Sequence, residues 1–483
     1  MDDSTWSRRH LCHPYKRRRK THSTTPSPGF LSSILLLCIA LVFIPLANAA
    51  PTCLRFADAV TINQLFTDGG PGTKVLLCPS KVYHLTSTIV FTAADQELAT
   101  FGYPTGPERA TLKVESPKQA TAIQGDCRRC ARIKIHSLVI DGNREGLGRM
   151  VEYDPSGLIV IGGNEGQSIK QCKIMDPRGF TAVHVREGDK LSCTGAIIEK
   201  NEIGPVGNEY DPDVDGDDPE MSPIGRPLAD GISIACRDSF VRDNTFFDNT
   251  AAAIVIYCSP GTLVHANHIY ARKRSMMGGI LMVDSTPFDG DYSKMIVKSN
   301  IIHAESRTIR VGIGIGAAVW SDDIDMILKG GSVVGNGFKG NYMGYSIAAA
   351  GLNGWTIKDN WDEAVHQGKR SARCFDEPVN PDPMPFLYYG DTVKESDIQS
   401  GFTDGEFQYG TYPTVPLRTP LIDQWSVSTV WKMVPILPKQ PRPPKRSKSH
   451  LPHPQLPPRH SQRSSTNPKW SSSQQGPRSW TIS

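Results

Sequence analysis

The chain has 483 residues, with 53 Lys and Arg, 49 Asp and Glu, and a formal net charge of +4. Residues 1–49 hold 7 basic and 2 acidic groups and residues 437–483 hold 9 basic and no acidic ones, which leaves a net charge of −10 for residues 50–436. This acidic part lacks the basic face that nucleic-acid binding requires, so we expect no nucleic-acid partner. It would also repel a polyanionic sugar unless calcium or a local arginine cluster intervened.

The amino terminus has the pattern of an export signal. Basic residues at Arg17–Lys20 precede the apolar run Ile34–Ala47, and Ala47-Asn48-Ala49 fits a small-x-small cleavage site. Residues 1–49 are therefore predicted to be a signal peptide, and the protein to be secreted. The alternative is a signal anchor, since the apolar segment could just span a bilayer. A cleaved signal predicts no stable membrane association.

Cysteine usage agrees with an oxidising compartment. Nine cysteines lie between Cys53 and Cys374, an odd number, so at least one is free or pairs between chains. The Cys127-x-x-Cys130 spacing has no second C-x-x-C pair to complete a zinc site, so it favours a disulfide. Cys53 and Cys78 flank the first segment and are expected to form a disulfide. Cys236 and Cys258 each follow a similar apolar strand and are expected to lie on adjacent strands, about 5 Å apart. For this pair a disulfide and two stacked free thiols both remain open.

The mature chain begins with an expected amphipathic helix at Ala57–Phe66, which would cover the open apolar end of a stack of coils. Residues 50–130 then form the cap and the first coils, and residues 131–361 the main stack. An irregular extension that packs on the coils is expected at 362–436. Residues 437–483 are rich in Pro, Ser, Lys and Arg without periodicity and are expected to be a disordered tail.

Short strands with alternating side chains recur along the stack. GISI at Gly231–Ile234 returns as AIVI at Ala253–Ile256, and each apolar strand is followed by a second strand with a polar residue in register. Stacked amides can hydrogen-bond to the rungs above and below, and asparagine tolerates a left-handed turn. These polar residues are Gln171, Asn201, Asn244, Asn267, Asn300, Asn336 and Asn360.

These repeats resemble the right-handed parallel β-helix of the pectin-lyase-like superfamily, and residues 52–361 are similar to its secreted fungal members. The resemblance implies an all-β solenoid and activity on cell-wall polysaccharide as a lyase or glycoside hydrolase. The polygalacturonase motif N-T-D is matched only by Asp230, and Ala251-Ala252 stand where that family has its second acid pair. A polygalacturonase mechanism is therefore not expected.

Strand alternation predicts which side chains face outward near Asp230. Stacking places His184, Ser233 and Val255 in one exterior column, and Arg186, Ala235 and Tyr257 in the next. Further polar groups are expected at the ends of these strands. The predicted site residues are Asp230, His184, Arg186, Glu187, Tyr257, Asp284 and Arg178.

Two reactions fit this set. Glycoside hydrolysis would use Asp230 with Glu187 or Asp284 as its two carboxylates. Elimination next to a uronate carboxylate would use a base and a cation from His184, Arg186 or Arg178, with Tyr257 as acid. The alternative, favoured by Ala251-Ala252, is a non-catalytic polysaccharide-binding or surface protein on the same fold. In either case we expect a monomer with polysaccharide as its partner.

An acidic insertion precedes Asp230. Its sequence matches the D-x-D-x-D-G opening of a calcium loop, but Ser222 occupies the twelfth position in place of the usual glutamate. A solvated acidic loop and a Ca2+ site are the two interpretations, and no other cofactor is expected. The calcium ligands would be Asp211, Asp213, Asp215 and Asp217.

Overall fold

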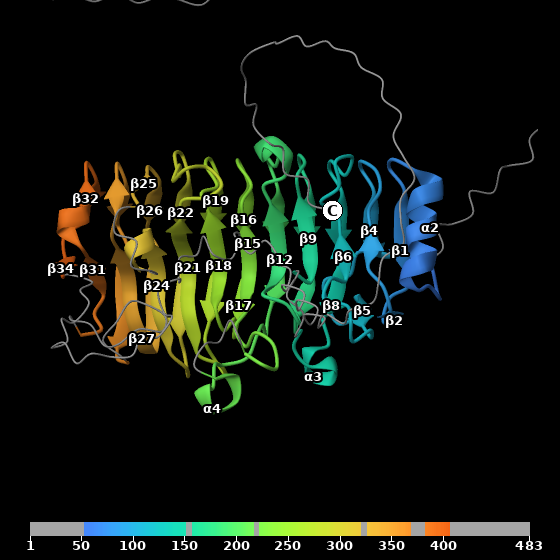
Figure 1. Ribbon diagram of the computed structural model, residues 1–483, viewed down its shortest axis with the longest axis horizontal. Helices are drawn as coiled ribbons and strands as arrows, with labels where there is room; N and C mark the ends of the chain where they lie inside the picture. Colours follow the sequence, from blue (N-terminus) through green and yellow to red (C-terminus); the bar gives the residue numbers. More distant parts are fainter. Residues whose placement is uncertain (1–52, 151–156, 217–221, 320–325, 369–381, 406–483) are drawn as a thin grey trace, which may run out of the picture. The chain divides into compact units, whose positions relative to one another are not determined.

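A computed structural model describes residues 53–150, 157–216, 222–319, 326–368 and 382–405. Successive coils follow one another from helix α2, blue in Figure 1, to strand β34, orange. A typical coil contributes one strand to each of three faces, and the paired strands of the described residues run parallel. The predicted parallel β-helix is therefore confirmed.

Helix α2 (Ala59–Gly69) is the predicted cap. The Asp58 side chain accepts a hydrogen bond from the Thr61 N–H at the start of the helix. Ala59, Ile62 and Phe66 are buried on the face that packs on the coils, and the Phe66 ring lies 4.8 Å from that of Phe91. The helix therefore covers the apolar interior at this end of the solenoid.

The first face is an 11-stranded sheet. Its strands are β1 (Lys74–Leu77), β4 (Glu97–Thr100), β7 (Lys134–His136), β10 (Ser168–Lys170), β13 (Ile197–Glu199), β16 (Phe240–Arg242), β19 (Leu263–His265), β22 (Ile296–Lys298), β26 (Ser332–Val334), β29 (Thr356–Lys358) and β33 (Asp397–Ile398).

The second face consists of β2 (Val82–Leu85), β5 (Ala110–Val114), β8 (Leu138–Asp141), β11 (Lys173–Met175), β14 (Glu202–Ile203), β17 (Thr245–Phe247), β20 (His268–Tyr270), β23 (Ile301–Ala304), the first part of β27 (Gly337–Ala349), and β30 (Trp361–His366). Because β27 continues without a break into the third face, these two faces form one hydrogen-bonded sheet.

The third face consists of β3 (Ile89–Val90), β6 (Ile123–Gln124), β9 (Ile159–Gly162), β12 (Thr181–Arg186), β15 (Asp230–Ile234), β18 (Ala252–Tyr257), β21 (Met276–Asp284), β24 (Ile309–Ile315), the end of β27, β31 (Phe386–Tyr388) and β34 (Thr403–Asp404). A small sheet of β25 (Leu328–Lys329), β28 (Leu352–Asn353) and β32 (Val393–Lys394) lies between elements of the last coils. Short helices include α3 (Arg144–Leu147) and α4 (Pro212–Asp215).

Identical inward positions stack along the axis and form the core. On the third face, Val183 pairs with Ile232 and Ile232 with Ile254, and all three are fully buried. Parallel strands lie about 4.8 Å apart, so each aliphatic side chain contacts its counterparts on the neighbouring rungs. Burial of each such side chain contributes about 1.5–3 kcal/mol, which explains why the G-I-x-I pattern recurs.

The asparagine ladder is confirmed as a hydrogen-bonded stack. Asn201 Nδ2 donates to Asn244 Oδ1 at 2.9 Å, and Asn244 Nδ2 donates to Asn267 Oδ1 at 3.0 Å. The same contact repeats through Asn300, Asn336 and Asn360, and its last instance among the described residues is from Asn360 Nδ2 to Gln399 Oε1.

Two details of the predicted ladder were wrong. Lys170 pairs with Glu199, so Cys172 and not Gln171 stands in register with Asn201. The left-handed residues are those before the asparagines, such as Lys200, Asp243 and Ser299 with φ of 58°, 56° and 54°. The asparagines are therefore selected for their amides and not for turn conformation.

Three disulfides join described cysteines. Cys53–Cys78 and Cys127–Cys130 are confirmed. Cys236, however, pairs with Cys193 and not with Cys258, which is a buried free thiol like Cys172. Cys374 lies outside the described residues.

The coils extend further than predicted. Strand β33 pairs with β29, and β31 pairs with β27, so regular coils continue into residues assigned to an irregular extension. The predicted signal region, most of the rest of that extension and the basic tail lie outside the described residues. In the part of the chain that the structure describes, no helix is both long and apolar enough to cross a membrane.

Candidate functional site

The predicted exterior columns lie on the third face. His184 pairs with Ser233 and Ser233 with Val255, which confirms the first column. Arg186, Ala235 and Tyr257 follow in the second column, each one residue beyond the pairs Val185–Ile234 and Ile234–Ile256. The sequence thus brings a histidine, an arginine and a tyrosine onto the outer surface of three adjacent strands.

Asp230 begins β15 and is held by two hydrogen bonds. Its Oδ2 accepts from Ser233 Oγ at 3.0 Å, and its Oδ1 accepts from the Ala252 N–H at 3.2 Å. The backbone N–H of Ala252, which stands where polygalacturonases have a pair of acids, therefore helps to orient this carboxylate. Ser233 was predicted to face outward, but its contact with Asp230 was not foreseen.

His184 lies at the centre of the polar part of this face. The Phe180 ring meets the imidazole edge to face, with centroids 5.2 Å apart. Burial, together with the nearby charge of Arg186, lowers the pKa of His184 to about 3. His184 is therefore neutral at physiological pH and cannot supply a cation, although its neutral imidazole can accept a proton.

Arg186 places a cation on this face. Its Nη1 lies 3.1 Å from Asp126 Oδ2, and 36% of its side chain is exposed. Asp126 was not among the predicted site residues. The sequence separation of 60 residues between Asp126 and Arg186 hides this contact. Gln124 pairs with Val160 and Val160 with His184, and Asp126 and Arg186 each lie two residues further along, so they fall in the same outward column.

The two carboxylates proposed as partners of Asp230 lie at the opposite end of the strands. Asp230 pairs with Thr181, and Glu187 is 6 residues further along that coil. Asp284 pairs with Tyr257, at the far end of β18 from Ala252. At about 3.3 Å per residue, each lies roughly 20 Å from Asp230. Glycosidases need about 5–9.5 Å between their carboxyl groups, so the structure does not bring either hydrolase pair together.

Glu187 and Asp284 themselves have different surroundings. Asp284 Oδ1 accepts hydrogen bonds from the Thr286 N–H at 2.8 Å and from Thr286 Oγ1 at 2.9 Å. The buried Oε2 of Glu187 has no hydrogen-bond partner among the described residues.

Arg178 was predicted to lie with the other site residues on the outer third face, and this prediction was wrong. It is buried, and its guanidinium donates to backbone carbonyls, including Gly148 O at 2.8 Å and Gln119 O at 3.0 Å. Burial lowers its pKa. Arg178 therefore joins loops of neighbouring coils, a role that only the folded chain reveals.

The acidic insertion contains a one-turn helix instead of an open loop. Asp211 caps α4 by accepting from the Asp213 N–H, and Asp215 accepts from Arg149 Nη1 and from Ser222 Oγ. The structure does not bring Asp211, Asp213 and Asp215 together as ligands, since the described residues contain no group of three His, Cys, Asp or Glu that could hold a metal ion. Asp217 lies outside the described residues, so calcium binding stays a prediction.

Most of the outer third face is buried. Asp230 is 9% exposed, His184 8% and Tyr257 4%. Next to the polar rungs lies a buried apolar cluster of Ala235, Ala252, Val255, Tyr257, Leu281 and Val283. Arg186 at the edge of this region is the predicted site residue with a clearly accessible charge.

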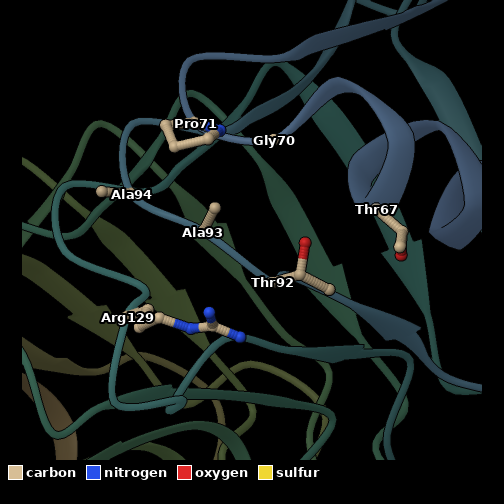
Figure 2. A pocket seen from close by; sticks show the side chains of 7 residues that line it. All are labelled: Thr67, Gly70, Pro71, Thr92, Ala93, Ala94 and Arg129. Carbon is tan, nitrogen blue, oxygen red and sulfur yellow. The ribbon is translucent and has the colours of Figure 1, made fainter.

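A pocket of about 540 Å³ lies elsewhere, near the cap helix. Figure 2 shows Arg129 pointing toward Thr92 across this pocket, with Pro71 and Ala94 on its other side. The pocket contains none of the predicted site residues.

Comparison with known proteins agrees with the fold. Residues 156–361 match the family model described as the right-handed beta helix region. No curated protein matches the chain.

Solved structures that are similar include an alginate lyase from a Paenibacillus species, with 12% identity, a TM-score of 0.40 and coverage of 65% of this chain and 98% of that one. The A-module of the Azotobacter vinelandii mannuronan C-5 epimerase AlgE6 has 13% identity, a TM-score of 0.39 and coverage of 68% and 97%. A DFA-IIIase from Arthrobacter chlorophenolicus without its lid has 14% identity, a TM-score of 0.41 and coverage of 76% and 98%. With its three parallel faces, the chain folds as a parallel β-helix, and residues 156–361 match the model of the right-handed beta helix region.

Proposed function

We propose that this protein is a secreted polysaccharide lyase that acts on a uronic-acid-containing cell-wall polysaccharide at the outer third face. The observation that carries the proposal is the column Arg186, Ala235, Tyr257. Arg186 and Tyr257 are two rungs apart, about 10 Å between backbones, and Ala235 occupies the same column on the strand between them. A uronate bound along this column would meet a cation on one rung and a phenol on another.

This arrangement suits β-elimination. The C–H bond next to the uronate carboxylate breaks, a C=C bond forms, and the glycosidic C–O bond breaks. Arg186 would neutralise the carboxylate as negative charge develops. The neutral imidazole of His184 would accept the proton, weakly because of its low pKa, and Tyr257 would donate a proton to the leaving oxygen. Hydrolysis is less well supported because Glu187 and Asp284, the carboxylates proposed as partners, lie roughly 20 Å from Asp230.

A non-catalytic polysaccharide-binding protein is the second candidate. The burial of Tyr257, His184 and Asp230 favours it, because a substrate must reach those groups for chemistry to occur.

Incubation of the secreted protein with polygalacturonate, alginate and neutral wall polysaccharides tests both candidates. A rise in ultraviolet absorbance from unsaturated ends supports the lyase. Reducing ends without unsaturation would overturn it in favour of a hydrolase, and binding without cleavage would support the second candidate.

Secretion is also part of the proposal. The three disulfides are typical of proteins from oxidising compartments. N-terminal sequencing of protein recovered from culture medium should find Ala50 first, and an intact amino terminus would contradict cleavage.

A further inference from the structure

Aromatic side chains lie on the outer surface of the second face, on the consecutive strands β17, β20 and β23 and again on β30, beyond β27. Phe247 pairs with Tyr270 and Tyr270 with His303 in one outward column, and His268 and Trp361 lie in the adjacent column. We call these five residues the aromatic stripe. The His268 and Tyr270 rings are nearly parallel, at 9° and 6.3 Å between centroids, and the His303 ring lies 5.9 Å from that of Tyr270.

Glycine makes room for the ring at one end of the stripe. A Cβ on Gly337 would lie 2.1 Å from the Trp361 ring, so the indole rests directly on the backbone of the neighbouring strand. Trp361 is nevertheless 37% exposed. A large apolar ring held flat on a sheet and open to solvent is a ready contact surface for a ligand.

Cations border the stripe. The guanidinium of Arg272 lies 4.2 Å from the centroid of the Tyr270 ring, and Lys339 Nζ lies 5.0 Å from that of Trp361. Both cations also contact carboxylates. Arg272 Nε lies 2.8 Å from Glu305 Oε2, and Lys339 Nζ lies 3.2 Å from Glu363 Oε2.

The buried carboxylate of Asp248 fixes the backbone of a turn that carries further basic residues beside Tyr270. Asp248 Oδ1 accepts the backbone N–H groups of Arg272, Lys273 and Arg274 at 2.8, 2.8 and 3.1 Å. Arg307 on the next turn donates from Nε to the Lys273 carbonyl at 3.2 Å. Lys273 and Arg307 are exposed. Four basic residues on two adjacent turns therefore stand next to the aromatic stripe, within residues 50–436, whose net charge is −10. We call these residues, Arg272, Lys273, Arg274 and Arg307, the cationic turns.

We propose that the aromatic stripe and the cationic turns form a binding site for an acidic polysaccharide, separate from the third face. The apolar C–H faces of successive sugar rings pack on the aromatic side chains, and sugar carboxylates bind the cationic turns, where arginine can form paired hydrogen bonds. Single-stranded nucleic acid also combines stacking with cations. The disulfides, which are typical of oxidising compartments, favour an extracellular polysaccharide instead.

Binding measurements on the full-length secreted protein test this site. The probes are polygalacturonate, a neutral xylan and an oligothymidylate, each followed by calorimetry or affinity electrophoresis. We expect polygalacturonate to bind more tightly than the other two, and Tyr270→Ala and the double variant Lys273→Glu, Arg307→Glu each to weaken it by about tenfold. The double variant changes only exposed side chains, so it tests the site even if Tyr270→Ala fails to fold.

The matched control is Lys294→Glu, Lys298→Glu, which makes the same change of charge at β22 and the turn before it. We expect this control to bind polygalacturonate within about twofold of the parent. Equal losses in both double variants, no loss in either, absence of polygalacturonate binding, or tighter binding of oligothymidylate would overturn the inference. Because binding is measured without turnover, a protein that binds through Tyr270 but cleaves nothing would refute only the proposed lyase.

Discussion

The backbone N–H of Cys172 donates to Asn201 Oδ1 at 2.9 Å, so this cysteine stands at the position that the next six coils fill with asparagine and the seventh with Gln399. Its Sγ lies 3.6 Å from the Ile135 carbonyl oxygen of the preceding coil. Asn201 Nδ2 makes the equivalent contact one coil later, with the Ile169 carbonyl oxygen at 3.0 Å. Cys172 is thus the first rung of the ladder, and its thiol is a weaker hydrogen-bond donor than the amide of an asparagine.

Replacement of Cys172 by asparagine should extend the ladder. The amide would donate to Ile135 O more strongly than the thiol does, so we expect Cys172→Asn to retain or raise the free energy of unfolding by up to about 1 kcal/mol. Cys172→Leu removes the donor and overfills the site, which should cost about 1–3 kcal/mol. Urea denaturation of both variants gives the comparison, and equal stabilities would argue against a ladder role.

Removal of an amide within the ladder should be more costly. Asn267 Oδ1 accepts from both the N–H and the Nδ2 of Asn244. Asn267→Leu would leave these buried donors without an acceptor, so we expect a loss of about 2–4 kcal/mol in unfolding free energy. Asn341→Ala, at an exposed position, is the control and should change stability by less than about 0.5 kcal/mol. A loss for Asn267→Leu no greater than for the control would contradict the assignment.

The disulfide pairing predicts different roles for two cysteines one rung apart. Cys193–Cys236 closes a separation of 43 residues, so Cys236→Ser should lower the free energy of unfolding by about 2–4 kcal/mol. Cys258→Ala leaves every disulfide intact and should cost less. Peptide mapping after alkylation should recover Cys258 as a thiol, and recovery of a Cys236–Cys258 peptide would disprove the pairing.

Two histidines should respond to pH in opposite directions. Burial and Arg186 lower the pKa of His184 to about 3. The unfolded chain therefore binds this proton first, and stability falls as the pH decreases from about 6.5 toward 3. Burial also disfavours the His366 cation, but hydrogen bonds to the Asp362 carboxylate and the Gly344 carbonyl outweigh it and raise its pKa. Its contribution is present below about pH 6.5 and is lost as the pH rises through the folded pKa.

Histidine NMR titration distinguishes these cases. The His184 signal should not shift between about pH 5 and 8, whereas that of His366 should titrate with a midpoint above about 6.5. A His184 midpoint near the ordinary value would show that its surroundings are more hydrated than the structure indicates.

The lyase proposal assigns separate tasks to Arg186 and Tyr257. Tyr257→Phe keeps the ring but removes the proton donor, and we expect about a 100-fold or greater loss of kcat. Arg186→Lys keeps the charge without paired hydrogen bonds and should mainly raise KM for a uronate substrate. Asp284→Asn is a comparison at the same end of the face and should have a smaller effect. Full activity of Tyr257→Phe would require another acid.

Sequence periodicity was sufficient for the coils because every rung repeats the same inward aliphatic pattern, as in Val183, Ile232 and Ile254. It was insufficient where neighbours in space are separated by insertions. Cys193 follows a loop that hides its equivalence to Cys236, and Gln171 seemed equivalent to Asn201 because the register was displaced by one residue.

The candidate site could be predicted only in part. Alternation predicted the columns of His184 and Arg186, but it says which face a side chain occupies and not how far along the strand it lies. Asp230, Glu187 and Asp284 therefore seemed close although register separates them. The carbonyl contacts of Arg178 depend on loops that no periodic pattern describes.

The asparagine ladder also has a direction. Each rung donates its N–H and its Nδ2 to an acceptor on the following coil, so Asn201 depends on Asn244, and Asn360 depends on Gln399. Gln399 reverses this relationship by donating from Nε2 back to the Asn360 carbonyl at 3.0 Å. During synthesis from the amino terminus, each new rung is left with open donors until the next one arrives. Gln399 thus closes the last rung of the ladder among the described residues, because its own amide donates backward instead of requiring an acceptor on a further coil.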